Sequence, residues 1–478
     1  MLNFYSLTLK NSKEKNLYRQ LVESDAVDAA TIKRGKKNLI SFACNDYFGL
    51  SQNLAVKKSA IAAIKKYGVG ARASRYVTGN NSLYTKLEKQ IARMKKCDEA
   101  IVFSSGYACA IGVIPALVGE GDLIVADKLI HSSLIDGSKL SGAKLMRFLH
   151  NDVLHARKIL QENRGKFKKC LIVTETVFSM DGDVGEVDEL LKLAVEFEAI
   201  LVSDDAHGLW GSDEISRWTG FVIPSMCSGQ VNSGNEQKVG VTNPDLLQQC
   251  DPRKFRDGDL SWTGFANPST CSGQVNSGNE HEDGVTNPVQ PQHKLLQDLN
   301  KTSSDFVSQK SSVSNADAFD PPPFSKEVFH LQLGTLSKST GSLGGYASGN
   351  KILIDYLRNF AKSAIYSTAL PPAILAASLT SLKIIEKKNL GKKTLENAAY
   401  FCQLMNLPNP QSAIVPIIIG DNKKTLEIAR KVAKKGFLIS AIRPPTVEVG
   451  KARLRITFSS EHKKTQIKEL AEVLINFI

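Results

Sequence analysis

Residues 170–208, CLIVTETVFSMDGDVGEVDELLKLAVEFEAILVSDDAHG, decide the fold because they contain two buried strands joined by an amphipathic helix. The apolar runs CLIVTETVF (170–178) and AILVSDDA (199–206) are typical of strands buried in a parallel sheet. Between them, VDELLKLAVEFE (187–198) places its apolar residues on one helical face and its first acids where the helix dipole favours them. This strand–helix–strand unit predicts an α/β fold with a mostly parallel sheet.

The same pattern extends in both directions from this unit. LIVAD (123–127) predicts a further buried strand, and HLQLGTLSK (330–338) predicts another that is followed by a helix over 371–386. Near the end of the chain, IVPIIIG (414–420), a basic amphipathic helix around 426–435 and the run RLRITFS predict a small α+β unit. We therefore expect four parts: an N-terminal arm (1–45), a large domain (46–212 and 329–385), an insertion (213–328) and a small C-terminal α+β domain (386–478).

The insertion contains a repeat. Residues 218–244, WTGFVIPSMCSGQVNSGNEQKVGVTNP, recur at 262–288 as WTGFANPSTCSGQVNSGNEHEDGVTNP, with 21 of 27 positions identical. Two copies are too few for a solenoid, and their Gly, Ser, Asn and Pro content offers little to bury. We expect a largely irregular insertion, with a binding module as the alternative.

Composition restricts the class of protein. The 478 residues carry a formal net charge of +13, but lysines are scattered along the chain, so we expect neither nucleic acid nor membrane as a partner. No apolar run approaches the roughly 18 residues of a membrane span, and residues 1–16 lack the apolar core of a signal peptide. None of the eight cysteines stands in a CxxC pair, so we expect free thiols, no metal site and a cytoplasmic location.

Three short segments carry side chains suited to chemistry. Lys338 follows a predicted strand and precedes a glycine-rich turn, where a partly desolvated amine could react with a carbonyl cofactor. Asp204 and His207 lie at the carboxyl end of a buried strand, where open α/β sheets bind ligands. The segment SSGYACAIG (104–112) opens a helix whose free N–H groups suit a phosphate. Taken singly, each also fits a structural role: a surface lysine, a capping aspartate beside a core histidine, or a simple helix start.

Ten segments in order resemble one family. The chain is similar to the α-oxoamine synthases, fold-type I pyridoxal 5'-phosphate (PLP) enzymes related to aspartate aminotransferase, and most closely to those that make 8-amino-7-oxononanoate. The resemblance covers roughly 16–211 and 330–478 and rests on NDYFGL (45–50), GARASRYVTGN (70–80), SSGYA (104–108), ADKLIHSSLIDG (126–137), RFLHND (147–152), ETVFSMDGD (175–183), DDAHG (204–208), GTLSK (334–338), YSTALPP (366–372) and AIRPPTVEVGKARLRIT (441–457).

The resemblance implies a role for each matching residue. Lys338 would form the Schiff base with PLP, Asp204 would pair with the pyridinium nitrogen, and His207 would contact the phenolate oxygen. His131 would stack on the ring. The remaining cofactor contacts would be Gly106, Tyr107, Ser179 and Thr335, with Ser367 and Thr368 reaching the phosphate from the other subunit of a homodimer.

The substrate contacts implied by the resemblance are Arg455 for the amino-acid carboxylate, His131 and Thr446, and more loosely Arg19 for the acyl group. Asn45 and Tyr47 would line the site, although a structural role in their turn is equally compatible with the sequence. DDAHG and the RPPTV segment favour the biotin-pathway reaction, in which L-alanine condenses with pimeloyl-CoA or pimeloyl-acyl carrier protein. The alternatives are another α-oxoamine synthase, using glycine or serine with a different acyl group, and a non-catalytic homologue disrupted by the insertion.

Overall fold

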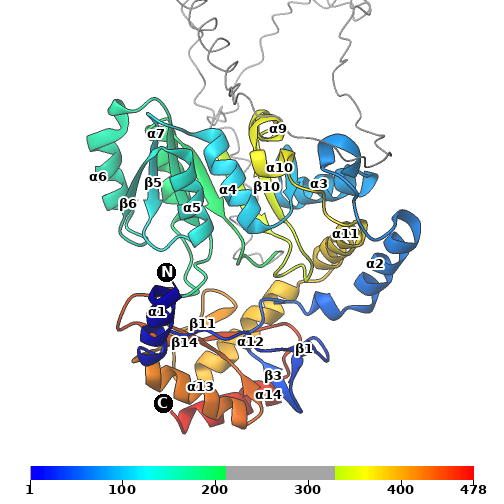
Figure 1. The fold of residues 1–478 in the computed structure, drawn as a ribbon, viewed down its shortest axis with the longest axis vertical. Coiled ribbons are helices and arrows are strands. Elements are labelled where there is room, and N and C mark those ends of the chain that lie inside the picture. The colour runs from blue at the N-terminus through cyan, green and yellow to red at the C-terminus, as the bar shows by residue number, and fades with distance from the viewer. Residues whose placement is uncertain (1, 211–328) are drawn as a thin grey trace, which may run out of the picture. The chain divides into compact units, whose positions relative to one another are not determined.

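A seven-stranded sheet forms the centre of the large domain in the computed structural model, which describes residues 2–210 and 329–478 (Figure 1). The expected insertion, 213–328, lies outside the described residues. The strand order is β4-β10-β9-β8-β7-β5-β6, and only β10 runs antiparallel to its neighbours. The strands are β4 (Glu99–Phe103), β5 (Leu123–Asp127), β6 (Lys144–Phe148), β7 (Cys170–Glu175), β8 (Ile200–Asp204), β9 (His330–Thr335) and β10 (Gly345–Gly349).

The predicted parallel strands are confirmed, and their register brings three strand ends together. Glu175 at the end of β7 pairs with Asp204 at the end of β8, and Asp204 pairs with Leu333 in β9. β7 ends three residues before the predicted apolar run does, because Phe178 turns to hydrogen-bond with the backbone carbonyl of Asp183. The carboxyl ends of β7, β8 and β9 therefore lie at one edge of the sheet, which is where ligands bind in open α/β sheets.

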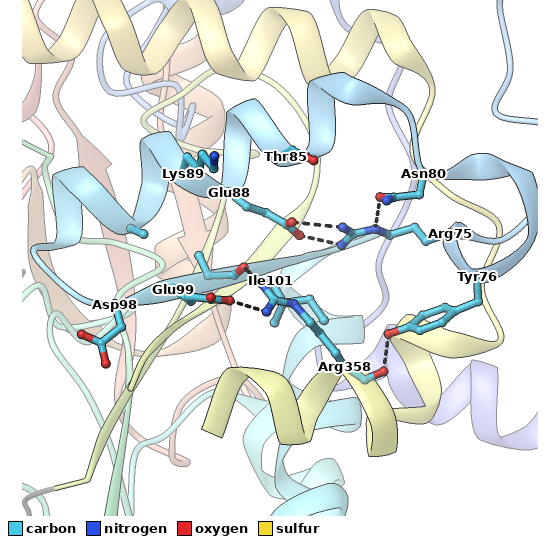
Figure 2. Close-up of a pocket in the computed structure, with 12 residues that line it drawn as sticks. Arg75, Tyr76, Asn80, Thr85, Glu88, Lys89, Asp98, Glu99, Ile101 and Arg358 are labelled. Carbon is cyan, nitrogen blue, oxygen red and sulfur yellow. Dashed lines mark hydrogen bonds and ion pairs between the residues drawn. The ribbon is translucent and has the colours of Figure 1, made fainter. Parts of the chain in front are cut away.

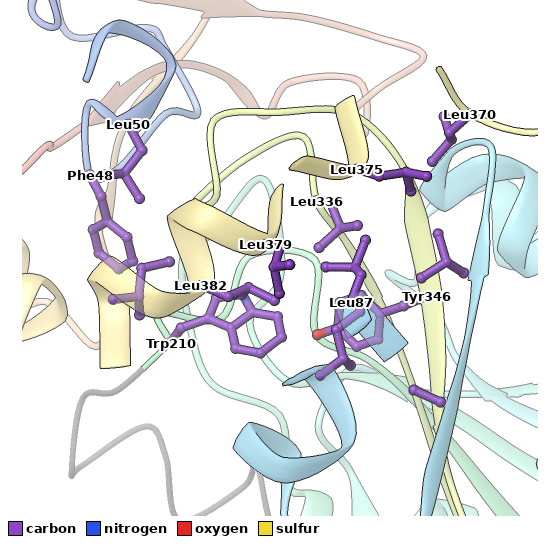
Figure 3. Packing of buried hydrophobic residues seen from close by; sticks show 14 of the residues in the cluster. Phe48, Leu50, Leu87, Trp210, Leu336, Tyr346, Leu370, Leu375, Leu379 and Leu382 are labelled. Carbon is purple, nitrogen blue, oxygen red and sulfur yellow. The ribbon is translucent and has the colours of Figure 1, made fainter. Parts of the chain in front are cut away.

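Helices on both faces of this sheet bury its apolar side chains. The large domain contains α2 (Leu54–Tyr67), α3 (Ser82–Lys95), α4 (Gly106–Leu117), α5 (Ser132–Ser141), α6 (Val153–Asn163), α7 (Val187–Glu196), α9 (Lys351–Phe360), α10 (Lys362–Ile365) and α11 (Pro372–Lys387). Figure 3 shows one part of the core, in which Leu379 and Leu382 of α11 lie near Leu87 of α3, Trp210 and Tyr346 of β10. Trp210, the last described residue before the gap, is thus anchored in the core.

The small C-terminal domain is built on a second, antiparallel sheet. Its strands follow the order β11 (Ile414–Gly420), β14 (Ala452–Thr457) and β13 (Ser440–Ile442). The helices α12 (Leu390–Leu404), α13 (Asn422–Lys434) and α14 (Lys464–Ile475) pack against it through a shared apolar cluster. The predicted α+β character of this region is confirmed.

The N-terminal segment differs from the expected arm. It contains α1 (Leu2–Glu14), β1 (Asp25–Ala26), β2 (Thr31–Arg34) and β3 (Lys37–Ser41). β3 pairs in parallel with β12 (Phe437–Leu438), so most of this segment joins the small domain rather than standing apart. The pairing is non-local, and two-residue strands carry no hydrophobic pattern that could have predicted it. No helix within 2–210 or 329–478 is long and apolar enough to cross a membrane.

Candidate active site

Seven of the predicted site residues line one pocket at the carboxyl ends of β7, β8 and β9. The pocket has a volume of about 220 Å³, and we call it the Lys338 pocket. The seven residues are Gly106, Tyr107, His131, Asp204, His207, Thr335 and Lys338. They come from four separate segments of the chain, so only the fold brings them together.

Lys338 lies in the loop that joins β9 to β10. Hydrogen bonds from the backbone N–H of Leu336 and the hydroxyl of Thr335 to the carbonyl oxygen of Gly344 close this loop. Gly341 adopts a φ of +61°, and a side chain there would overlap the backbone of Ser51. The glycine-rich turn thus fixes where the lysine emerges.

The amine of Lys338 is set up to lose its proton. Its Nζ lies 2.6 Å from Nε2 of His207. Burial lowers the pKa of Lys338 from 10.5 to about 8, although the nearby carboxylates of Asp204 and Glu175 oppose this change. Near neutral pH a useful fraction of the amine is therefore neutral, which nucleophilic attack and proton abstraction both require.

The two adjacent aspartates of DDAHG have different surroundings. Asp205 forms a 2.5 Å ion pair with Lys95, both side chains being 1% exposed, and accepts a hydrogen bond from Thr176. The Lys95 ammonium also lies 4.1 Å from the ring centroid of Trp210. Asp204 instead lines the Lys338 pocket, where one of its oxygens accepts the backbone N–H of Ala206. Asp204 is therefore the carboxylate available to a ligand, and Asp205 anchors the strand end beneath it.

His207 is held between two groups. Its Nδ1 lies 2.7 Å from Oη of Tyr47, and its Nε2 faces Lys338. Burial, reinforced by the positive charge of Lys338, lowers the pKa of His207 well below its ordinary value, so the imidazole is neutral. Tyr47 also lies 3.5 Å from a guanidinium nitrogen of Arg455. Tyr47 thus links the histidine to the arginine, a role that its position in NDYFGL did not reveal.

The start of α4 forms another wall of the Lys338 pocket. Ser105 caps this helix by accepting the backbone N–H of Ala108, and Gly106 begins it. A Cβ at Gly106 would lie 3.3 Å from Cβ of Thr335, so this position is packed closely against β9. Tyr107 is 46% exposed and its hydroxyl donates to Asp136. The helix start thus offers backbone N–H groups beside the hydroxyl of Ser337, a set of donors that suits a phosphate.

The donors in this pocket fit PLP. A lysine with a lowered pKa could bind its aldehyde, the carboxylate of Asp204 could pair with a pyridinium nitrogen, and the α4 start could hold the phosphate. His131 lines the same pocket, with Nδ1 2.8 Å from the Ser133 hydroxyl, and burial lowers the pKa of its imidazole. A neutral ring there is compatible with stacking on an aromatic cofactor.

Two other predicted residues line a neighbouring pocket. Ser179 and Thr446 border a cavity of about 350 Å³ that also contains His150. The Ser179 carbonyl accepts a hydrogen bond of 2.6 Å from Nε of Arg455, and Arg19 donates one of 3.1 Å to the Thr446 hydroxyl. The structure therefore places Arg19 and Thr446 together, and Arg455 beside Ser179.

Ser367 and Thr368 lie elsewhere in this chain. Neither lines the Lys338 pocket; Thr368 forms an isolated bridge with Ser74, and the preceding Tyr366 is 79% exposed. Any contact between these hydroxyls and the Lys338 pocket must therefore come from a second copy of the chain.

A larger pocket lies between α3, β4 and α9 (Figure 2). Its volume is about 510 Å³. Arg75 forms an ion pair with Glu88, Arg358 forms one with Glu99, and the Tyr76 hydroxyl donates to the Arg358 carbonyl. The two arginines and two glutamates pair with one another, and none of the predicted site residues lines this pocket, so it is not the candidate active site.

One further network was not predicted from the sequence. His150 of RFLHND lies 3.2 Å from Asp127 and 2.7 Å from Asp183, which belongs to ETVFSMDGD. Burial would lower the pKa of His150, but the two carboxylates raise it to about 10. The histidine therefore carries a positive charge that ties the 179–183 loop to β5. The sequence shows both segments but not that they touch.

The fold and this site together define a fold-type I PLP enzyme. A family model described as "Aminotransferase class I and II" matches residues 37–223 and 298–474. The chain has the same fold as serine palmitoyltransferase of Sphingomonas wittichii, with a TM-score of 0.70 and 19% identity, covering 99% of this chain and 96% of that one. The cofactor of this chain is pyridoxal 5'-phosphate.

Closer relatives narrow the class. The chain is 36% identical to 8-amino-7-oxononanoate synthase of Methylocella silvestris, over 94% of this chain and 99% of that one. It is 34% identical to 8-amino-7-oxononanoate synthase of Methylobacterium nodulans, over 98% and 95% respectively. The chain belongs to the α-oxoamine synthase family of PLP-dependent enzymes, as its sequence motifs predicted.

Proposed function

We propose that this chain condenses L-alanine with a pimeloyl thioester, releasing CO₂ and the thiol carrier and giving 8-amino-7-oxononanoate for biotin biosynthesis. The relatives that carry this name support the proposal, because they match nearly the whole chain. The observation that carries it is the joint placement of Lys338, Asp204 and His207 in one pocket, with the Lys338 amine partly neutral near pH 7.

The division of labour among the residues follows from their surroundings. Bound PLP supplies an electron sink for the carbanion that forms when the amino acid loses its α-proton. Lys338 removes and returns that proton, because it is the basic group in the pocket with a suitable pKa. Asp204 carries the negative charge that holds the cofactor nitrogen protonated, and neutral His207 keeps Lys338 oriented through the 2.6 Å contact.

Arg455 is the proposed binding group for the alanine carboxylate. Its side chain is buried on β14, and within 2–210 and 329–478 no carboxylate pairs with it. Its hydrogen bonds go to neutral oxygens: the Ser179 carbonyl, the Asn45 side chain and the Tyr47 hydroxyl. A buried guanidinium without an anionic partner is energetically unfavourable, so a substrate carboxylate would complete the site.

The acyl substrate is proposed to enter through the pocket that contains Ser179 and Thr446. That pocket adjoins Arg455 through Ser179 and is bordered at Thr446 by the exposed guanidinium of Arg19. A homodimer is part of the proposal, since Ser367 and Thr368 can act on PLP only from a neighbouring subunit. A cytoplasmic location is also part of the proposal.

A substrate panel tests this function. The purified holoenzyme is offered L-alanine, glycine or L-serine together with pimeloyl-CoA, pimeloyl-acyl carrier protein, acetyl-CoA or palmitoyl-CoA, and free thiol is measured. We expect L-alanine with a pimeloyl thioester to give the highest kcat/KM, with 8-amino-7-oxononanoate identified by mass spectrometry. Preference for another pair would reassign the chain within its family, and no thiol release from any pair would mean a non-catalytic homologue.

A further inference from the structure

Glu175 is a buried acid in the active site to which the chemistry above gives no role. It ends β7 directly beside Asp204, which ends β8, because the two residues are in register on neighbouring parallel strands. Both line the Lys338 pocket. Glu175 is only 2% exposed, and its Oε1 has no hydrogen-bond partner within the described part of the chain.

Two carboxylates side by side at neighbouring strand ends do not both ionise readily, because each disfavours the charge on the other. Burial raises the pKa of Glu175 well above its ordinary value, and the charge of Asp204 raises it further. Burial also raises the pKa of Asp204, but the charge of Lys338 and the hydrogen bond from the backbone N–H of Ala206 act to lower it. The proton shared by the pair therefore belongs on Glu175.

The other charged and titratable groups around Glu175 leave this assignment unchanged. Lys338, after β9, and the backbone N–H groups of His131 and Ser179 lower the pKa of Glu175, but burial outweighs them. His207, also in the pocket, is held neutral by burial. No lysine or arginine within 2–210 and 329–478 forms an ion pair with Glu175.

We propose that Glu175 is a positioning residue held as a neutral carboxylic acid, so that the negative charge of the pair stays on Asp204. This inference rests on the proposed role of Asp204 toward the cofactor nitrogen. A second anion beside Asp204 would favour proton uptake by Asp204 and so remove the charge that the pyridinium needs. The neutral acid avoids this, and its Oε1, which has no partner among the described residues, remains able to take part in a hydrogen bond.

The first test uses the apoprotein and needs no activity. The thermal midpoints of wild type and Glu175→Gln are measured from pH 5 to about 9. This range lies above the ordinary glutamate pKa of about 4.3. A carboxyl group whose pKa is higher in the folded state makes the protein less stable as pH rises, because the group ionises at a lower pH in the unfolded chain. Glutamine carries no such proton, so the midpoint of Glu175→Gln should rise relative to wild type with increasing pH. Parallel pH profiles would overturn the proposal.

The matched control is Glu162→Gln, on the exposed surface of α6. We expect its midpoint to follow the wild-type pH profile. A pH-dependent gap as large as that of Glu175→Gln would show that the gap does not come from the buried pair, and would also overturn the proposal.

The second test measures PLP affinity by absorbance titration. Glu175→Gln keeps the neutral hydrogen-bonding side chain, so it should bind PLP within about threefold of wild type, whereas Glu175→Ala should bind at least tenfold more weakly. Loss of binding in Glu175→Gln to the level of Glu175→Ala would overturn the proposal. If wild type itself bound no PLP, the proposed function would fail, whereas the apoprotein profiles would still decide the charge state of Glu175.

Discussion

At the residue scale, the charge state of each group in the Lys338 pocket follows from what surrounds it. The DDAHG motif offers two aspartates of identical chemistry, and only their partners distinguish them. Asp205 forms an ion pair with Lys95 and accepts a hydrogen bond from Thr176, whereas Asp204 lines the pocket. Burial lowers the pKa values of Lys338 and His207 together, so near neutral pH a partly neutral amine lies beside a neutral imidazole. The chemistry of the site is thus a consequence of desolvation as much as of residue identity.

Replacement of Lys338 tests the residue on which the mechanism depends most. Lys338→Ala should fold and retain some cofactor. Its turnover should fall by about a hundredfold to ten-thousandfold, because the covalent attachment and the proton-transfer group disappear together. Turnover and visible absorbance are measured alongside Lys192→Ala, an exposed lysine on α7 that should behave as wild type. Wild-type turnover in Lys338→Ala would show that Lys338 is neither the Schiff-base residue nor the proton-transfer group.

Arg455 tests the proposed carboxylate contact. Arg455→Lys keeps the charge but loses the planar fork, so kcat/KM for L-alanine should fall about tenfold to a hundredfold, as expected for a charged hydrogen bond worth about 1.5–3 kcal/mol. Most of the effect should appear in KM for the amino acid, with KM for the acyl thioester nearly unchanged. An effect confined to the thioester would place Arg455 at the other substrate.

At the element scale, the site is an assembly of strand ends and the loops that follow them. β7, β8 and β9 supply Glu175, Asp204 and the loop of Lys338, and α4 supplies its first turn. β14 of the small domain brings Arg455 to Tyr47, which in turn contacts His207 of this pocket. The two domains therefore both contribute to one site, and loops between them must be held in position.

The His150 network holds one of these loops, residues 179–183, in position, and the charge of His150 makes this effect depend on pH. A histidine whose folded pKa is raised from about 6.5 to about 10 stabilises the fold fully below pH 6.5, and this contribution is lost as pH rises through about 10. His150→Gln should therefore lower the thermal midpoint most near pH 6, with the difference from wild type shrinking toward pH 10. The measurement is a series of melts of the two proteins. A difference independent of pH would mean that His150 is not charged in the folded protein.

Sequence patterns predicted local structure, and residues that share the Lys338 pocket, better than the contacts between distant segments. The run 199–206 and the helix over 187–198 are local, so their hydrophobic periodicity was enough to predict β8 and α7. The pairing of β3 with β12, the Lys95–Asp205 ion pair and the contact of Tyr47 with His207 join residues far apart in sequence. Periodicity carries no information about such contacts, so they could only be seen in the folded chain.

At the scale of the whole molecule, the unusual feature is the long stretch of sequence between the adjacent strands β8 and β9. The two strands are adjacent and parallel, with Leu201 opposite His330, although residues 211–328 separate them in sequence. A parallel connection must return along the length of a strand, which needs about a dozen residues or more. Beyond that length, each doubling adds only about 0.6 kcal/mol of closure entropy.

Deletion of the insertion follows from this arrangement. Replacing 213–328 with a Gly/Ser-rich linker of about fifteen residues, above the minimum for a parallel crossover, should preserve PLP binding and keep kcat/KM within a few-fold. PLP titration and the substrate assay measure the two effects. If this variant were insoluble or free of cofactor, the insertion would be an integral part of the fold, and the boundaries proposed from the sequence would be wrong.

The most direct measurement of the central claim follows one carbon atom. The holoenzyme is incubated with pimeloyl-CoA and L-alanine labelled at its carboxyl carbon, and both CO₂ and product are analysed by mass spectrometry. Decarboxylative condensation at the Lys338 site predicts that the label leaves as CO₂ in equal amount to the free thiol, and that the 8-amino-7-oxononanoate formed contains none. Label retained in an amide-linked or transaminated product, or thiol release without labelled CO₂, would contradict it.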